Sequence, residues 1–199
     1  MRKLIDPVVN RWGRVLAGIG MTANAVTGLG LGLGLIAAAM IALGAAGWLA
    51  LIPLLAGRVA DGLDGAVARA STPTDFGGYL DIVCDFLFYG AIPLAFVLRD
   101  ADANGMAGAF LLCSFYFNGA TFLGFAILAA KKGMQTDARG QKSLYFTAGL
   151  LEGSETIAIF IAFCLWPAGF APLAWLFGGV CFITAIARVM LAWRIFKAG

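Results

Sequence analysis

Residues 61–69 have the sequence DGLDGAVAR and residues 77–85 have the sequence GGYLDIVCD, so four aspartates interrupt two long apolar runs. Of the 199 residues, 61% are hydrophobic and only 13% are charged, and the mean hydropathy is +0.90. This composition lies outside the usual range of soluble domains. A carboxylate within a membrane-spanning helix is unfavourable unless another group compensates its charge. The two stretches therefore predict a membrane protein with a functional polar site among its helices.

Six apolar segments are long enough, at about 20 residues each, to cross a bilayer as helices. We expect them at residues 22–45, 47–68, 76–98, 105–130, 144–166 and 170–193. Their residues do not alternate between apolar and polar, as the strands of a membrane β-barrel would. The sequence thus predicts an all-α integral membrane protein with six transmembrane helices, a single domain over residues 1–199 whose six-helix bundle occupies 22–193.

Residues 1–18 are predicted to form a helix that lies in the membrane interface. Polar residues such as Asn10 and Arg11 are interleaved there with apolar residues such as Val8, Val9 and Trp12. Because this segment lacks an apolar core region, we do not expect it to be a cleavable signal peptide.

The basic residues predict the orientation of the helices in the membrane. Of the 14 lysines and arginines, only Arg99 falls on the side opposite to the others. Because basic residues favour the cytoplasmic side, both termini and the aspartates are expected at the cytoplasmic face of an inner (cytoplasmic) membrane. The net charge of +3 gives no reason to expect a nucleic-acid partner.

The four aspartates have the spacing of residues that share a helix face. Asp61 and Asp64 are three residues apart, and Asp81 and Asp85 are four residues apart on the next helix. A short connection would make these helices antiparallel neighbours, so we expect the two pairs to converge. The chain has no histidine, and none of its four cysteines has a metal-ligand spacing. All ligands would therefore be oxygens, which favours Mg²⁺ or Mn²⁺, with Ca²⁺ as a further candidate. Four carboxylates can hold two such ions, an arrangement that serves phosphoryl transfer.

The pattern Asp-x-x-Asp-Gly-x-x-Ala-Arg, followed by Gly-x-x-x-Asp-x-x-x-Asp, resembles the signature of the CDP-alcohol phosphotransferases, or CDP-alcohol phosphatidyltransferases. The signature covers residues 61–85, and the six-span layout extends the resemblance over most of the chain. Seven residues separate Arg69 from Gly77, where the family usually has eight or more. We therefore expect a loop that is shorter by one residue, which leaves its local geometry open. Upstream, the TANAVT sequence of residues 22–27 resembles the family's Pro-Asn-x-x-Thr, with Ala23 in place of proline.

The resemblance implies an enzyme that transfers a phosphatidyl group from CDP-diacylglycerol to a small polar alcohol and releases CMP. It further implies that two divalent cations lie on the donor's pyrophosphate, that Asp85 is the base that deprotonates the acceptor, and that the protein is a homodimer in the lipid bilayer. The implied metal ligands are Asp61, Asp64, Asp81 and Asp85. The implied nucleotide-binding residues are Asp61, Gly65, Ala68, Arg69, Gly77 and Asn24. Arg69 could instead favour the helix dipole or extend to the membrane surface.

No motif identifies the acceptor alcohol. Basic residues near the cytoplasmic side favour a phosphorylated acceptor such as glycerol 3-phosphate, while inositol phosphate, serine or another alcohol are alternatives. Arg58 would contact a ligand phosphate or neutralise the aspartates, and the basic residues between the fourth and fifth spans would bind phosphate or set the topology. Two glutamates of the fifth span would line an acceptor pocket or pair with Arg188. The candidate acceptor-binding residues are Arg58, Arg139, Lys142, Glu152, Glu155 and Arg188.

Two other classes of function compete with the enzyme. A divalent-cation transporter would use the carboxylates as a permeation site, but it gives no role to Gly65, Ala68 or Arg69, and the aspartates gather near one end instead of forming a path. A non-catalytic assembly protein would leave the four carboxylates unexplained.

Overall fold

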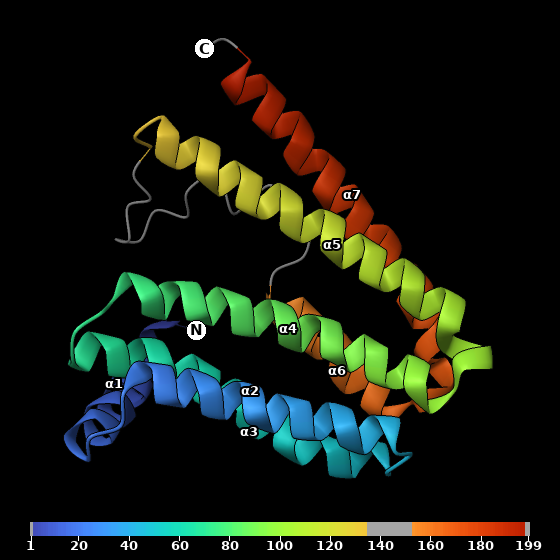
Figure 1. Cartoon of the computed structure of the whole chain (residues 1–199), viewed down its shortest axis with the longest axis horizontal. Coiled ribbons are helices and arrows are strands. Elements are labelled where there is room, and N and C mark those ends of the chain that lie inside the picture. Colours follow the sequence, from blue (N-terminus) through green and yellow to red (C-terminus); the bar gives the residue numbers. More distant parts are fainter. Residues whose placement is uncertain (1, 135–152, 198–199) are drawn as a thin grey trace. The chain divides into compact units, whose positions relative to one another are not determined.

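The structure is a computed structural model that describes residues 2–134 and 153–197. Within these ranges the chain is helical and contains no strand, which confirms the all-α prediction (Figure 1). The elements are α1 (Arg2–Gly18), α2 (Ala23–Ala42), α3 (Gly47–Ala70), α4 (Asp75–Arg99), α5 (Ala101–Lys131), α6 (Gly153–Leu165), the 3-10 helix η1 (Pro167–Gly169) and α7 (Phe170–Phe196).

Four of the described helical segments are long and apolar enough to cross a membrane, namely α2, α4, α5 and residues 167–196, which include α7. Helix α3 has 24 residues but carries several charges, and the described part of the fifth predicted span is the 13-residue α6. Large apolar side chains are exposed along the helices, for example Ile52 at 63% and Leu176 at 67%. Extensive exposed apolar surface suits contact with lipid, and the chain is a membrane protein.

Side-chain caps explain where several helices begin. The side-chain oxygens of Thr22, Thr74 and Asp100 each accept a hydrogen bond from the backbone N–H three residues later, at 3.2, 3.0 and 3.0 Å. These caps start α2, α4 and α5. Helix α5 thus begins at Ala101, four residues before the expected start at residue 105, because Asp100 caps it directly after α4 ends.

The helices form two compact units, Met1–Arg99 and Asp100–Gly199. In the first unit, α2 packs against α3 and α4, and α1 packs against α3. The contacts are close because glycines lie at them: a Cβ at Gly57 would come within 2.8 Å of the Gly30 carbonyl oxygen, and a Cβ at Gly13 within 2.7 Å of the Ala66 backbone. Helix α3 therefore approaches α2 and α1 backbone to backbone, as small residues allow in membrane proteins.

In the second unit, aromatic side chains fill the space between the helices. The rings of Phe110 on α5 and Trp175 on α7 lie 4.4 Å apart, and the rings of Phe163 and Phe170 lie 4.7 Å apart. Phe160 and Phe163, both on α6, are fully buried. Ring contacts such as these bury large apolar areas within the unit.

Candidate active site

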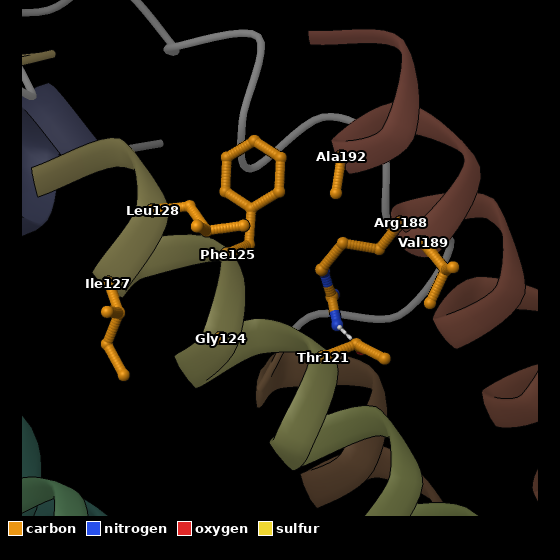
Figure 2. Close-up of a pocket in the computed structure, with 8 residues that line it drawn as sticks. All are labelled: Thr121, Gly124, Phe125, Ile127, Leu128, Arg188, Val189 and Ala192. Atoms are coloured by element: carbon orange, nitrogen blue, oxygen red, sulfur yellow. Dashed lines mark hydrogen bonds between the residues drawn. The ribbon is translucent and has the colours of Figure 1, made fainter. Parts of the chain in front are cut away.

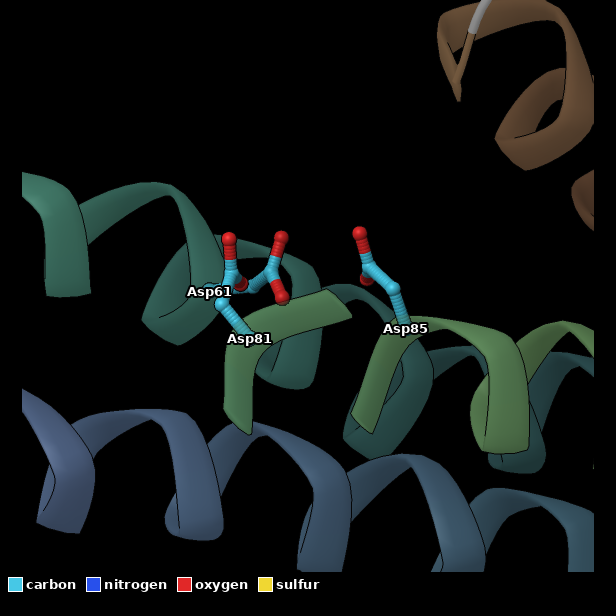
Figure 3. A group of neighbouring side chains, drawn as sticks. All are labelled: Asp61, Asp81 and Asp85. Carbon is cyan, nitrogen blue, oxygen red and sulfur yellow. The ribbon is translucent and has the colours of Figure 1, made fainter. Parts of the chain in front are cut away.

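The predicted carboxylate site forms where α3 and α4 face each other in the first unit. Asp61 of α3 and Asp81 and Asp85 of α4 each offer one oxygen, and these oxygens all lie within 4.8 Å of one another. Figure 3 shows the three side chains pointing to the same side of the two helices. Each aspartate is half-buried. Three hard oxygen ligands at this separation fit a divalent cation such as Mg²⁺ or Mn²⁺.

Asp64, the fourth predicted ligand, lies beside this group but has a different partner. It is 9% exposed, and its Oδ2 accepts a hydrogen bond of 2.7 Å from the hydroxyl of Thr27 on α2. Three residues along a helix correspond to about 300° of rotation, so Asp61 and Asp64 point about 60° apart. The structure thus brings three of the four predicted aspartates together and turns the fourth toward α2.

Arg58, one turn before Asp61, already compensates the carboxylates. Its Nη1 donates a hydrogen bond of 3.0 Å to Asp85 Oδ1 and lies 3.4 Å from Asp61 Oδ1. The Arg58 side chain is only 12% exposed, and its guanidinium carbon lies 3.9 Å from the centre of the Phe88 ring. Of the two roles predicted for Arg58, these contacts match neutralisation of the aspartates.

Gly65 and Arg69 of the motif lie beside each other on the next turn of α3. A Cβ at Gly65 would lie 3.4 Å from Arg69 Nη1, so the guanidinium lies over the position that has no side chain. Arg69 Nη2 donates a hydrogen bond of 3.0 Å to Asn10 Oδ1 of α1. Ala68 is half-buried on the same face of α3 as Asp61 and Gly65. At the end of this face lies the Arg69 side chain, which is hydrogen-bonded to α1.

Asn24 and Gly77, both predicted to contact nucleotide, lie together although 52 residues separate them in sequence. A Cβ at Gly77 would come within 3.1 Å of both Asn24 Oδ1 and Thr74 Oγ1. Any other residue at position 77 would have to displace these side chains. The connection between α3 and α4 is residues 71–74, so the short loop still allows the aspartates of the two helices to converge.

Arg188 is the described acceptor candidate with the most buried side chain, at 7% exposed. Its Nη1 lies 2.9–3.0 Å from three neutral oxygens of α5, which are Asn118 O, Asn118 Oδ1 and Thr121 Oγ1. It borders a cavity of about 380 Å³ between α5 and α7, shown in Figure 2. The cavity is lined by Thr121, Gly124, Phe125, Ile127, Leu128, Arg188, Val189 and Ala192.

The remaining acceptor candidates lie in or next to the undescribed segment. Arg139, Lys142 and Glu152 fall outside the described residues. Glu155 is exposed in the first turn of α6, and its Oε2 accepts a hydrogen bond of 3.0 Å from Ser154. The described hydrogen bonds of Arg188 go to α5, and the ion pair considered for it with the glutamates of the fifth span stays a prediction.

Sequence reasoning missed several partners in these contacts. Thr27 follows Asn24 by one helical turn in the TANAVT segment, so the resemblance to Pro-Asn-x-x-Thr was a usable signal for it. Asn10, Phe88 and Thr121 carry no such signal, because their importance depends on contacts with residues that are distant in the chain.

A family model described as CDP-alcohol phosphatidyltransferase matches residues 20–196. The chain belongs to the CDP-alcohol phosphatidyltransferase family. It is 42% identical over 196 residues to inner membrane protein YnjF of Escherichia coli (strain K12), an alignment that covers 98% of this chain and 94% of that protein. The match confirms the resemblance and makes the chain a transferase of substituted phosphate groups that acts in phospholipid biosynthesis.

Solved structures share the fold of this CDP-alcohol phosphatidyltransferase. Mycobacterium tuberculosis phosphatidylinositol phosphate synthase (PgsA1) with CDP-DAG bound superposes with a TM-score of 0.72 at 23% identity, over 94% of each chain. The same synthase in complex with manganese and citrate gives a TM-score of 0.70 at 23% identity, over 93% of this chain and 88% of that one.

Proposed function

We propose that the protein transfers a phosphatidyl group from CDP-diacylglycerol to a small polar alcohol, with release of CMP. The observation that carries the proposal is the convergence of Asp61, Asp81 and Asp85 beside the low surface of Gly65. The structural relative PgsA1 has been solved with CDP-DAG bound, which supports this donor. The acceptor oxygen forms a bond to the lipid-side phosphorus, and the bond from that phosphorus to the CMP oxygen breaks.

The carboxylates would hold two divalent cations, Mg²⁺ or Mn²⁺, with Ca²⁺ as a further candidate. The proposed ligands are Asp61, Asp64, Asp81 and Asp85, an all-oxygen set that suits these hard cations. When bound, the ions stabilise the negative charge on the attacking and leaving oxygens. The structure of PgsA1 with manganese supports a divalent metal in this fold.

Asp85 is proposed as the general base. Its Oδ1 accepts the Arg58 hydrogen bond, so we assign the acceptor's proton to Oδ2. The chain has no histidine, and a carboxylate at the site is therefore the available base. Asn24, Gly65, Ala68, Arg69 and Gly77, with Asp61, are proposed to contact the nucleotide, because the structure gathers them along α3 and at the starts of α2 and α4.

A phosphorylated acceptor such as glycerol 3-phosphate is the proposed second substrate. Arg188 supports it, because this buried cation is bonded to neutral oxygens and borders a cavity. Arg58, Arg139, Lys142, Glu152 and Glu155 remain candidates for the same role. Inositol phosphate is an alternative, and PgsA1 is a phosphatidylinositol phosphate synthase. Serine or another alcohol without a phosphate is a further alternative that would leave Arg188 without a phosphate to bind.

We propose a single domain over residues 1–199 with six transmembrane helices, a homodimer in the inner membrane with both termini and the active site on the cytoplasmic side. The relative YnjF is an inner membrane protein. Helix α1 is proposed to lie in the membrane interface, because Val8 and Trp12 are exposed at 57% and 56% beside the basic Arg11.

The test is CMP release by purified protein with CDP-diacylglycerol, Mg²⁺ or Mn²⁺, and a panel of phosphorylated and unphosphorylated alcohols. Because Asp85 is both base and ligand, Asp85→Asn should lower kcat by at least about 10³-fold. Asp75→Asn, at the exposed start of α4, is the matched control and should retain activity. Both variants should melt as cooperatively as the wild type in detergent. Undiminished turnover by Asp85→Asn contradicts the base assignment, and ion flux in proteoliposomes without nucleotide would favour a transporter.

A further inference from the structure

Two of the aspartates proposed to bind metal, Asp61 and Asp85, already contact the positively charged side chain of Arg58. Arg58 Nη1 lies 3.0 Å from Asp85 Oδ1 and 3.4 Å from Asp61 Oδ1, so a single nitrogen bridges α3 and α4. The family motif begins at Asp61 and does not include Arg58. The contacts of Arg58 therefore bring a residue from outside the motif to the carboxylate site.

The position of the Arg58 guanidinium is fixed by its surroundings. Its carbon lies 3.9 Å from the centre of the Phe88 ring, a distance at which a cation is attracted to an aromatic face. A Cβ at Gly34 would come within 2.5 Å of that ring, so Gly34 leaves the space in which the ring lies. Arg58 Nε is buried and has no hydrogen-bond partner among the residues that the structure describes. Leaving a buried donor unbonded is unfavourable, so the placement is governed by Asp61, Asp85 and Phe88 rather than by solvation.

We propose that Arg58 is a resident counter-cation that stabilises the metal-free carboxylates and competes with the divalent ion for Asp61 and Asp85. This inference rests on the proposed metal-binding role of the same aspartates. A divalent ion at these oxygens would lie a few ångströms from a fixed positive charge, and like charges at that separation in a partly buried site repel strongly. Arg58 therefore weakens metal binding in the absence of the substrate, and the carboxylates stay compensated when no metal is bound.

The first test is Mn²⁺ binding to the purified full chain in detergent without nucleotide, measured from the electron paramagnetic resonance signal of free Mn²⁺. Arg58→Met keeps the length of the side chain and removes the charge, so it should lower the dissociation constant by about tenfold or more. Arg58→Lys keeps the charge and should therefore bind Mn²⁺ within about threefold of the wild type. Arg14→Met removes a charge from an exposed position on α1 and should leave the dissociation constant unchanged.

The second test is thermal melting of the same proteins in EDTA and in Mn²⁺. Without metal, Arg58→Met should melt at a lower temperature than the wild type, because Asp61 and Asp85 lose their compensating charge. Added Mn²⁺ should raise its melting temperature by more than it raises that of the wild type. If Arg58→Met does not fold, Arg58→Gln carries the same expectation, because it can still donate a hydrogen bond to Asp85 without a charge.

The outcomes separate this inference from the proposed function. If the wild type binds Mn²⁺ and Arg58→Met binds it no more tightly, the competition is refuted while the metal site stands. If neither the wild type nor Arg58→Met binds Mn²⁺, the proposed metal site is refuted and the inference fails with it. The proposal is supported if Arg58→Met binds Mn²⁺ more tightly than the wild type and Arg58→Lys, which keeps the charge, does not.

Discussion

Arg58 in the first unit and Arg188 in the second are both largely buried, but they differ in the groups that receive their hydrogen bonds. Arg58 contacts two carboxylates, Asp61 and Asp85, whereas Arg188 contacts the neutral oxygens of Asn118 and Thr121. The charge of Arg58 is thus compensated within its own unit. The described hydrogen bonds of Arg188 go to dipoles at the edge of a cavity.

The two units also differ in how their helices pack. Helices α2 and α3 meet at Gly30 and Gly57, where one backbone touches another. Helices α5 and α7 meet at Gly178, where a Cβ would come within 2.8 Å of the Phe110 ring. A ring can shift or rotate more easily than a backbone can move. The first unit should therefore hold its carboxylates more rigidly than the second unit holds its cavity.

The largest effect we expect from this comparison concerns the charge of Arg188. Arg188→Gln should raise the KM for a phosphorylated acceptor about 10- to 100-fold, the loss typical of a hydrogen bond to a charged group. The KM for CDP-diacylglycerol should change little. The matched control is Arg194→Gln, an exposed position on the same helix α7. Unchanged acceptor KM values in Arg188→Gln would mean that the charge serves the packing of α5 and α7 instead.

Thermal melting in detergent of three glycine-to-alanine variants should distinguish packing against a backbone from packing against a ring. Gly57→Ala meets a backbone oxygen and should lower the free energy of unfolding by about 1–3 kcal/mol. Gly178→Ala meets a ring and should have a smaller effect. Gly62→Ala, also on α3, has open space around it and should be neutral or stabilise by about 0.5–1 kcal/mol. A larger loss at Gly178 than at Gly57 would reverse the proposed order of rigidity.

The smallest effect should come from the contact that joins α1 to the site. Asn10→Ala removes the exposed hydrogen bond to Arg69 and should raise the KM for CDP-diacylglycerol by less than about tenfold, as expected for one hydrogen bond. Asn10→Asp keeps an acceptor for Arg69 and should stay close to the wild type. If both variants behave alike, the hydrogen bond does not position Arg69 for the donor.

Features that depend on neighbours in sequence could be predicted, and features that depend on distant contacts could not. The helices of the first unit begin and end within a few residues of the predicted bounds because the apolar runs and caps such as Thr22 are local. The spacing of Asp81 and Asp85 and the short connection were enough to bring them near Asp61. The orientation of Asp64 depends on Thr27, which is 37 residues away.

The same limit applies to the two arginines. The partners of Arg188 lie 67 and 70 residues before it, and no periodic pattern links them. The bridge from Arg58 to Asp61 follows from helical spacing, but the bond to Asp85 depends on how α3 and α4 face each other. The sequence thus allowed both roles of Arg58 and could not choose between them.

The contact between Gly13 and Ala66 has a consequence for the depth of the site in the bilayer. The two helices touch so closely there that α1 cannot slide along α3 without a collision. If α1 rests at the level of the lipid headgroups, as its exposed Trp12 suggests, its height fixes the height of Asp61 and Arg69 along the membrane normal. Helix α1 would then hold the carboxylates at the depth in the bilayer where the phosphates of a lipid substrate lie.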